Sequence, residues 1–431
     1  MGYDAQPGRR LSAADQLGVR RHNLSMVLRR LRDEGPRSRA GIAAETGLNK
    51  ATVSSLVAEL TDRALVRDGT AERSSMGRPG QPVELDGRHV CGIGIAVDAD
   101  ALTALVLNFR GDEVSRSRVP LPARSLGPDG VLDRLAELVA ECHDRVAAGP
   151  GVPAGLTIAV PGLVESHTGV VAVAPNLGWR SVPLADELSG RLGQPTYPLR
   201  VGNAANLAAL AEYSVADPAD RDELLLLTGD TGIGGGAVTG GRLLRGARGF
   251  SGEVGHLPLD PAGLPCACGA RGCWQTVVGM KALLTAAADP DDPVCDPALG
   301  RDERVAELVR RAEAGDARTI GAIERVGAWL GTGAAILVSM LNPHVLVLGG
   351  YFSAVGRWLT GPLTRELHAR VLAPGAGGCR VQLSTLGSGA AVLGGARTAL
   401  DAVFDDPTLV PKTAPEPSPD GRAVLAPGGP S

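Results

Sequence analysis

Aromatic side chains are scarce: phenylalanine, tyrosine and tryptophan make up 3% of the 431 residues. Because hydrophobic residues still reach 44%, we expect a sizeable core built from alanine, valine and leucine. No apolar run approaches the ~18 residues of a membrane-spanning helix. The N-terminal stretch is polar and lacks the apolar centre of a secretory signal peptide. These absences predict a cytoplasmic protein with no membrane partner.

Lysine is nearly absent beside arginine, yet positive charge is concentrated at one end of the chain. Residues 1–90 hold 15 Lys+Arg against 11 Asp+Glu, a net charge of +4, and the remaining residues carry −8, which gives −4 for the whole chain. A basic segment on an acidic body is typical of a protein that meets nucleic acid through that segment alone.

A chain of this length is expected to form two or three domains. Alternating β-rich and helical runs after the basic segment predict an α/β body. Within it, "VCGIGIAVDADALTALVLNFRGDEV" and "ELLLLTGDTGIGGGAVTGGRL" each indicate strand, tight turn and strand, which favours two similar lobes facing a cleft. We expect a disordered N-terminus (1–19), a DNA-binding domain (20–88), a first lobe (89–200), a second lobe (201–404) and a disordered, Pro/Gly-rich tail (405–431).

The stretch "SRAGIAAETGLNKATVSSLVAEL" predicts two short helices joined by a tight turn. Ser38 and Asn49 are good N-caps, and Gly47 suits a turn that needs positive φ. Ala43, Gly47 and Val53, at offsets 0, 4 and 10, let the two helices cross closely, as a helix-turn-helix requires. An ordinary helical hairpin has the same spacing, so the flanking segments decide between the two.

Both flanking segments favour DNA binding. Upstream, "RRHNLSMVLRRLRDEG" predicts a basic amphipathic helix that braces the unit, and downstream, "ALVRDGTAERSSMGRPGQPVEL" predicts the strand, loop and strand of a wing. Gly-Arg-Pro at the wing tip would present one arginine to a minor groove. The second helix carries short polar side chains that can approach base edges and phosphates. The predicted DNA-contacting residues are Arg39, Asn49, Lys50, Ala51, Thr52, Ser54, Ser55 and Arg78.

The seven cysteines are an odd number, and three of them lie within eight residues. Cys266, Cys268 and Cys273 form a C-x-C-x4-C pattern, with His256 ten residues before the first. Three thiols and an imidazole are soft ligands that bind zinc tetrahedrally. In a reducing compartment a metal site is favoured over a disulfide framework. Because the set has no obvious open position, we expect structural Zn²⁺ that orients His256.

The chain resembles the ROK family, which groups bacterial sugar-responsive repressors with sugar kinases, and the resemblance covers roughly residues 20–400. Its most specific motifs are "SGEVGH", "CACGARGCW", "AVPGLV" and "APNLGW". The resemblance implies an actin-like (ribonuclease H-like) α/β body of two lobes with a sugar bound between them. It implies sugar contacts from the residues matching the G-E-x-G-H and V-E-N-D-A-N motifs and from the position after C-W. These predicted ligand-binding residues are Asn203, Glu253, His256 and Gln275, the last standing where the family commonly has glutamate.

Two replacements argue against phosphoryl transfer. Family kinases use the aspartate of V-E-N-D-A-N as a base, whereas "VGNAAN" has Ala204 there and Gly202 in place of the glutamate. Their first phosphate loop, D-I-G-G-T, aligns with "AVDAD", so Asp98 and Ala99 replace its glycines and Asp100 its threonine. Phosphoryl transfer needs a base or orienting group and an anion-binding cradle. We therefore expect no catalytic residues and no kinase activity, although the glycines of "TGDTGIGGG" are kept.

The sequence thus favours a transcriptional regulator, a repressor of carbohydrate-related genes, whose DNA affinity is set by a sugar or sugar derivative in the cleft. Helix-turn-helix proteins usually act as dimers on palindromic sites, so we expect a homodimer or homotetramer on operator DNA. Ligand-dependent lobe closure would change the spacing of the paired DNA-binding domains. Two alternatives stay open: a sugar kinase that also binds DNA, and a constitutive DNA-binding protein whose cleft has lost its ligand.

Overall fold

The structure is a computed structural model, and it describes residues 13–69, 81–296, 299–372 and 378–412. The chain divides into two compact units: residues 1–90 together with 401–431, and residues 91–400. None of the helices in the described ranges is both long and apolar enough to cross a lipid bilayer. The first unit contains the predicted DNA-binding segment, and the second contains the predicted two-lobed body.

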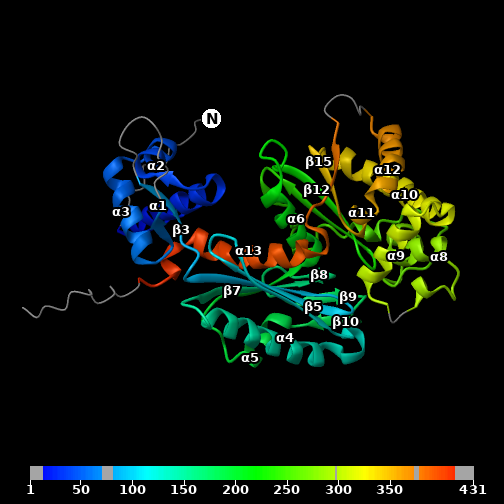
Figure 1. Cartoon of the computed structure of the whole chain (residues 1–431), viewed down its shortest axis with the longest axis horizontal. Helices are drawn as coiled ribbons and strands as arrows, with labels where there is room; N and C mark the ends of the chain where they lie inside the picture. Colours follow the sequence, from blue (N-terminus) through cyan, green and yellow to red (C-terminus); the bar gives the residue numbers. More distant parts are fainter. Residues whose placement is uncertain (1–12, 70–80, 297–298, 373–377, 413–431) are drawn as a thin grey trace, which may run out of the picture. The chain divides into compact units, whose positions relative to one another are not determined.

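The N-terminal part of the first unit combines helices with a small antiparallel sheet, one strand of which lies between the first two helices (Figure 1). The Ser38 side chain accepts a hydrogen bond from the Gly41 N–H at 3.0 Å, and the Asn49 side chain accepts one from the Thr52 N–H at 2.8 Å. Both residues therefore begin helices, as predicted, and Gly47, with φ +71°, makes the turn between them. The elements are α1 (Ala13–Glu34), β1 (Arg37–Ser38), α2 (Arg39–Thr46), α3 (Lys50–Asp62), β2 (Val66–Asp68) and β3 (Pro82–Leu85), with sheet order β1-β3-β2.

Helix α1 braces this unit through an apolar stripe. Leu24 and Leu28 are fully buried, as are Val53 and Leu60 of α3, and the two helices pack against each other. The helix begins at Ala13, within the stretch 1–19 for which the sequence predicted disorder. Buried side chains hold the middle of α1 in place, so its first turns can continue the helix with few contacts of their own.

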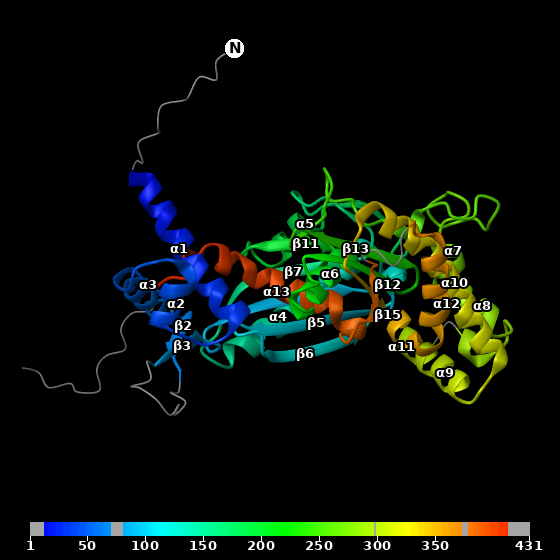
Figure 2. The same cartoon turned by 90° about the horizontal axis from the view of Figure 1, so that it is seen from above.

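The first unit also includes residues 401–412, from the other end of the chain. Helix α13 (Ala390–Asp405) ends here, and a short 3₁₀ turn, η4 (Pro407–Leu409), contacts α1 (Figures 1 and 2). The sequence assigned these residues to the second lobe and to a disordered tail. Acidic side chains of this segment instead pair with arginines of α1, and its backbone accepts hydrogen bonds from Arg63. The contacts are Asp401–Arg32 (3.4 Å), Asp405–Arg29, Asp406–Arg21 (3.2 Å), Lys412–Asp62 (3.2 Å) and Arg63 to the carbonyl oxygen of Val410 (2.6 Å).

The second unit contains two five-stranded sheets with the same strand order. In each sheet a meander of three antiparallel strands comes first in the chain, and two further strands are added beside the first strand of the meander. This repetition agrees with the predicted pair of similar lobes. The first sheet has the order β11-β7-β4-β5-β6 and comprises β4 (Val90–Val97), β5 (Ala101–Asn108), β6 (Glu113–Pro120), β7 (Val152–Val160) and β11 (Leu199–Asn203). The second has the order β14-β13-β12-β15-β16 and comprises β12 (Glu223–Gly229), β13 (Ile233–Thr239), β14 (Arg242–Leu243), β15 (Val345–Gly350) and β16 (Arg380–Leu383).

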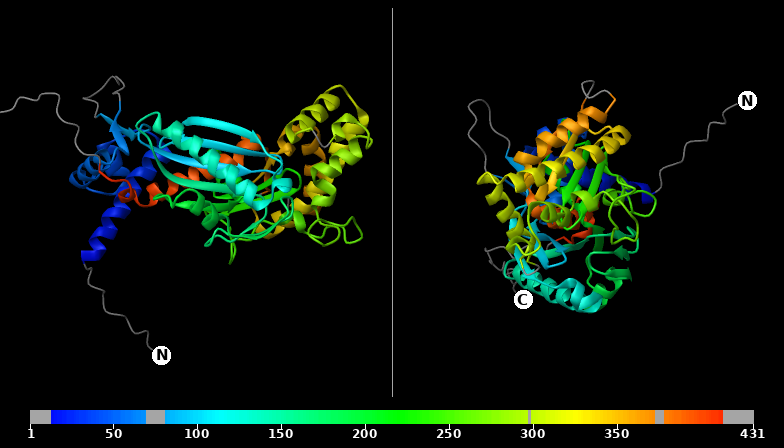
Figure 3. Two further views of the ribbon diagram at one scale, coloured as in Figure 1. Left: turned by 90° about the horizontal axis from the view of Figure 1, so that it is seen from below. Right: turned by 90° about the vertical axis from the view of Figure 1, so that its right-hand side faces the viewer.

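Helices cover both faces of each sheet. In the first lobe, α4 (Ala123–Ala147) and α5 (Leu184–Arg191) lie on one face, as the left panel of Figure 3 shows for α4, and α13 lies on the other. A small sheet of β8 (Leu163–Val164), β9 (Val171–Ala174) and β10 (Trp179–Val182) adjoins them. In the second lobe, α6 (Ala204–Val215) covers one face of the sheet. The remaining helices are α7 (Gln275–Val278), α8 (Met280–Ala287), α9 (Arg301–Glu313), α10 (Ala317–Leu341), α11 (Tyr351–Ala354) and α12 (Gly356–Arg370), with 3₁₀ turns η1 (Val254–His256), η2 (Pro293–Cys295) and η3 (Gly387–Gly389).

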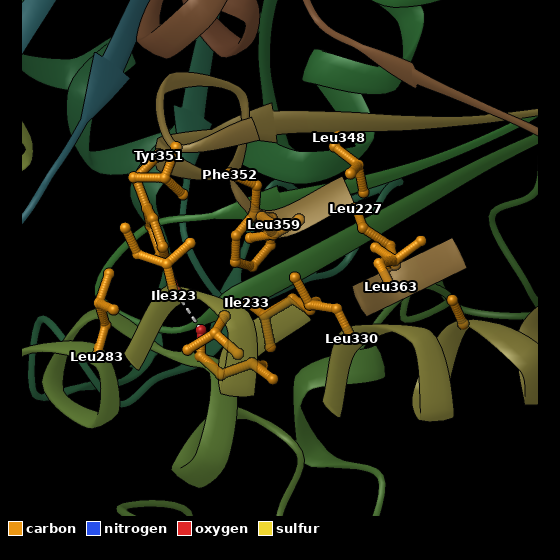
Figure 4. Packing of buried hydrophobic residues seen from close by; sticks show 14 of the residues in the cluster. Leu227, Ile233, Leu283, Ile323, Leu330, Leu348, Tyr351, Phe352, Leu359 and Leu363 are labelled. Carbon is orange, nitrogen blue, oxygen red and sulfur yellow. Dashed lines mark hydrogen bonds between the residues drawn. The ribbon is translucent and has the colours of Figure 1, made fainter. Parts of the chain in front are cut away.

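The leucine run of β12 packs into the core of the second lobe on both of its faces. Leu225 and Leu227 point into a cluster with α8, α10, α11 and α12, part of which Figure 4 shows. Leu224 and Leu226 point to the opposite face and pack on the alanines of α6. Both faces of the strand are buried, so the sequence shows a continuous apolar run instead of alternation. Alanine on α6 keeps that helix close to the sheet.

Helix α13 approaches the first lobe at backbone distance. A Cβ atom on Gly155 of β7 would lie 2.5 Å from the carbonyl oxygen of Ala399, and Gly92 and Gly94 of β4 are equally close to the backbone of α13. Only glycine allows such an approach. The first lobe therefore extends past the predicted boundary at residue 200, to the end of β11, and it includes the packing surface of α13.

Candidate metal centre and ligand cavity

The four predicted metal ligands lie together at the end of η1 and in the loop that follows it. Their ligand atoms, on His256, Cys266, Cys268 and Cys273, all fall within 4.8 Å of one another. The Sγ atoms of Cys268 and Cys273 are 3.7 Å apart, and Sγ of Cys266 is 3.8 Å from Nδ1 of His256. A tetrahedral ion with metal–sulfur bonds of about 2.3 Å would place its sulfurs about 3.8 Å apart. The spacing therefore suits a bound metal ion.

The loop geometry follows from its glycines and from one buried tryptophan. Gly269 and Gly272 have φ of +94° and +66°, values that favour glycine, and they turn the chain so that Cys273 returns to the other ligands. Trp274, the next residue, is fully buried, and its indole N–H donates to the carbonyl oxygen of Trp329 on α10 at 3.0 Å. The metal loop is thus anchored directly in the core of the second lobe.

His256 faces two environments through its two ring nitrogens. Nδ1 points toward the cysteines, whereas Nε2 lies 4.0 Å from Oε2 of Glu253. Burial lowers the pKa of His256, which favours the neutral imidazole that can bind a metal. A metal on Nδ1 would leave the proton on Nε2, directed toward Glu253.

Asn203 joins this group from β11, 50 residues earlier in the chain. Its amide nitrogen donates to Oε1 of Glu253 at 3.3 Å and to the carbonyl oxygen of Gly162 at 2.8 Å. Its amide oxygen accepts from the backbone N–H of Asn206 at 3.0 Å, so Asn203 also caps helix α6. The N–H directed at Glu253 is the longer of the two bonds and is the one most easily redirected to a ligand.

These side chains line a cavity of about 150 Å³ in the second unit. Residues from both lobes form its wall, including Asn203, Ala204, Glu253, His256 and Gln275. Burial raises the pKa of Glu253. Gln275 lines the cavity too, but its amide nitrogen donates to Sγ of Cys266 at 2.9 Å, so it also borders the metal centre. The cavity combines carboxylate, amide and imidazole groups, which pair well with sugar hydroxyls.

Three charged residues that line the cavity were not predicted as site residues. Asp98 lies in the turn between β4 and β5, Asp230 in the turn between β12 and β13, and Arg301 is the first residue of α9. Arg301 Nη1 is 2.8 Å from Asp230 Oδ1. Burial, together with the neighbouring Asp230, raises the pKa of Asp98 to about 7, although Arg301 opposes this shift. Nothing local in the sequence marks Arg301, because its partners are far away along the chain.

Most of the predicted DNA-contacting side chains are exposed on the first unit. Lys50, Ala51, Ser54 and Ser55 are exposed, while the opposite side of α3 is buried through Val53, Leu56, Val57 and Leu60. Arg39 forms an ion pair with Asp68 at 3.0 Å, which a phosphate group would have to displace. The remaining predicted contacts are Asn49, which is exposed, Thr52, which is half-buried, and Arg78, which lies outside the described residues.

The family model described as "ROK family" matches residues 92–402, and the chain belongs to the ROK family. A xylose repressor from Bacillus subtilis (strain 168) is 28% identical over 401 residues, covering 93% of this chain and 100% of that protein. A glucokinase from Halalkalibacterium halodurans is 30% identical over 313 residues, covering 70% of this chain and 93% of its own length. The structure is also similar to the crystal structure of a ROK family transcriptional regulator described as a homolog of the E. coli MLC protein. That match has a TM-score of 0.74 and 25% identity and covers 90% of this chain and 97% of that one.

The extent of these matches differs in an informative way. The match to the glucokinase covers 93% of the glucokinase but only 70% of this chain. The repressor and the regulator match most of this chain, so they include sequence beyond the part shared with the kinase. These relatives support the repressor side of the family and an actin-like two-lobed body.

Proposed function

We propose that this protein is a sugar-responsive transcriptional repressor that binds DNA through its first unit and a sugar in the cavity of its second unit. Ala204 carries the proposal. It lines the cavity directly after Asn203, so the cavity keeps groups for sugar hydroxyls beside a methyl group that cannot accept a proton. Loss of a general base typically costs about 10²–10⁴-fold in rate.

The DNA-binding part of the proposal rests on the exposed face of α3 and on its basic surroundings. Lys50, Thr52 and Ser54 suit contacts with phosphates and base edges. We propose that two first units, supplied by a homodimer or homotetramer, bind the two halves of a palindromic operator. A sugar that prefers the DNA-incompetent state by a few kcal/mol then releases the repressor, by linkage between the two sites.

We propose that the metal is Zn²⁺ and that its role is structural. The set of three thiols and one imidazole, at tetrahedral spacing, supports zinc. The ion would bind Nδ1 of His256, and this bond would hold the ring with Nε2 directed toward Glu253. The zinc takes no part in chemistry on the sugar.

A sugar kinase that also binds DNA is the second candidate, because of Asp98. Its carboxyl lines the same cavity, and its pKa of about 7 suits proton transfer near neutral pH. Against this, Arg301 fills the space beside it and is paired with Asp230. An assay for ADP release, run over a panel of pentoses and hexoses, decides between the two functions. Sugar-dependent ADP release that is abolished by Asp98→Asn or Glu253→Gln would favour the kinase.

The repressor proposal is tested by DNA affinity with and without sugars. The purified protein is used to select DNA from a random library, and its Kd for the selected site is measured by fluorescence anisotropy at fixed salt. We expect at least one monosaccharide to change Kd by tenfold or more, and Glu253→Gln to remove that change. DNA binding that no sugar alters, with no thermal stabilisation by any sugar, would support a constitutive DNA-binding protein.

A further inference from the structure

Three segments that are far apart in the chain meet between the two lobes of the second unit. The turn between β4 and β5 contributes Asp98 and Asp100, the turn between β12 and β13 contributes Asp230, and α9 begins at Arg301. Asp98, Asp230 and Arg301 line both the small cavity described above and a larger cavity of about 720 Å³. The charged groups of the three segments therefore lie at the border between the two cavities.

Helix α9 is fixed to the second lobe. Leu308 and Ala312 are buried in the same core cluster as the leucines of β12. The start of the helix is held to this lobe as well, because Nη1 of Arg301 lies 2.8 Å from Oδ1 of Asp230. Both the body and the first turn of α9 thus belong to the second lobe.

The same first turn also reaches the first lobe, through the residue after Arg301. Oδ2 of Asp302 lies 3.3 Å from Nη1 of Arg118 on β6, the edge strand of the first sheet. Nη2 of Arg118 lies 3.8 Å from Oδ1 of Asp100 in the β4–β5 turn. Arg118 is therefore shared between a carboxylate of its own lobe and a carboxylate of the other lobe.

Arg301 adds an electrostatic link between the lobes. Only 16% of its side chain is exposed. Burial disfavours the charged form, but the carboxylates of Asp230 and Asp98 outweigh it and raise the pKa of Arg301. Asp98 belongs to the first lobe and Asp230 to the second, so one guanidinium is attracted to both hairpin turns. Because Arg301 is largely buried, salt screens this attraction less than it screens an ion pair between exposed side chains.

We propose that Arg301 and Asp302 act as a clasp, which holds the two lobes of the second unit together with no nucleotide between them. On the first lobe the clasp engages Asp98 and Arg118. The turn that contains Asp98 aligns with the first phosphate loop of the family's kinases, and its carboxylates repel a phosphate but attract a guanidinium. An internal cation thus links the two turns in this chain. The clasp goes beyond the proposed function, because it needs neither DNA nor a sugar.

The first test measures the distance between the lobes in solution. Azido-phenylalanine is placed at Glu141 of α4 and Glu324 of α10 to carry two fluorophores, because both positions are exposed and lie outside the clasp. Single-molecule energy transfer then gives the ratio of open to closed molecules. We expect Arg118→Gln and Asp302→Asn each to raise this ratio at least threefold. An unchanged ratio in both variants would overturn the proposal.

Glu113→Gln is the matched control. Glu113 pairs with Arg116 at 2.8 Å on the same strand as Arg118, but within the first lobe alone, so its loss should leave the ratio unchanged. The double variant Arg118→Gln/Asp302→Asn separates a direct contact from two independent effects. We expect it to open the lobes less than twofold beyond the larger single effect. Single effects that multiply in the double variant, or a control that opens the lobes equally, would contradict the clasp.

Salt and nucleotide provide a third test, on the unaltered protein. Raising the salt concentration to ~1 M, where the screening length falls to about 3 Å, should open the lobes by weakening the exposed Arg118–Asp302 pair. Asp302→Asn should remove most of this response. ATP or ADP with Mg²⁺, at millimolar concentration, should leave the ratio unchanged. Closure by nucleotide, or a ratio that ignores salt, would overturn the proposal. None of these measurements uses DNA or a sugar, so the clasp can fail while the proposed function stands.

Discussion

Replacing Gly394 by alanine should force α13 away from α6. Gly394 lies in α13, and a Cβ at this position would overlap the backbone carbonyl oxygen of Leu207 in α6. Backbone cannot yield as a flexible side chain can, so relief requires the helices to separate by roughly 1 Å or more, and overpacking of this kind costs about 1–3 kcal/mol. Helix propensity works in the opposite direction, because alanine exceeds glycine by about 1 kcal/mol in a helix interior.

The adjacent residue provides a matched control. A Cβ on Gly395 would lie 3.3 Å from the nearest atom, the carbonyl oxygen of Thr157, a close contact that needs only a small adjustment. Gly394→Ala and Gly395→Ala share the same gain in helix propensity, so the difference between them isolates the packing cost. We expect Gly394→Ala to be less stable than Gly395→Ala by about 1–3 kcal/mol. Urea unfolding, followed by circular dichroism, gives both values.

The same substitution should also reach the ligand cavity. Helix α6 begins at the Asn203 cap, and its first turn lines the cavity through Ala204 and Ala205. Displacement of α6 would move these groups, so Gly394→Ala should weaken sugar binding while Gly395→Ala leaves it within threefold. Equal unfolding midpoints and equal sugar affinity for the two variants would refute the close packing of α13 on α6.

Three further predictions concern the other sites. Cys268→Ser should lower bound zinc from one ion per chain to near zero by elemental analysis, because a tetrahedral site loses one of its thiolates; full zinc retention would contradict the ligand set. Lys50→Ala should weaken DNA binding about equally across sequences and lower the salt dependence by about one counterion, whereas Lys281→Ala, on α8 of the second unit, should not. Asp98 has a pKa raised to about 7 from an ordinary value near 3.8, so its ionisation disfavours the folded state as pH rises through that window. Asp98→Asn should therefore stabilise the protein above pH 7 by urea unfolding, and the gain should shrink toward pH 4; a gain independent of pH would argue that the carboxyl is not the cause.

The features that sequence reasoning anticipated are local ones. The helix caps at Ser38 and Asn49 depend on a residue and the N–H group three positions later, so spacing alone predicts them. The metal ligands likewise lie close together in the chain, and glycines beside them predict the tight loop. The repeated strand–turn–strand pattern predicted two lobes because each hairpin is also a local structure. In these cases the relevant contacts are encoded within a short window.

The meeting of Asp98, Asp230 and Arg301 at the cavity could not be anticipated in the same way. Arg301 stands in a charged stretch, "GRDERV", that is typical of an ordinary exposed helix start. Its role arises only when the fold brings two hairpin turns against the end of α9, and no local pattern records that meeting. Gln275 lines the cavity, as its predicted sugar contact requires, but the hydrogen bond from its amide to Sγ of Cys266 was not anticipated. Long-range placement decides what such a side chain does.

The pairing of residues 401–412 with α1 has a consequence for how the protein is made. The two parts of the first unit are separated by the whole of residues 91–400. At ~5–20 residues per second, a ribosome needs about 15–60 s to synthesise that interval. During this time the arginines of α1 have emerged without Asp401, Asp405 and Asp406. The DNA-binding unit is completed last, so a chain interrupted during synthesis lacks the acidic partners of its own basic helix.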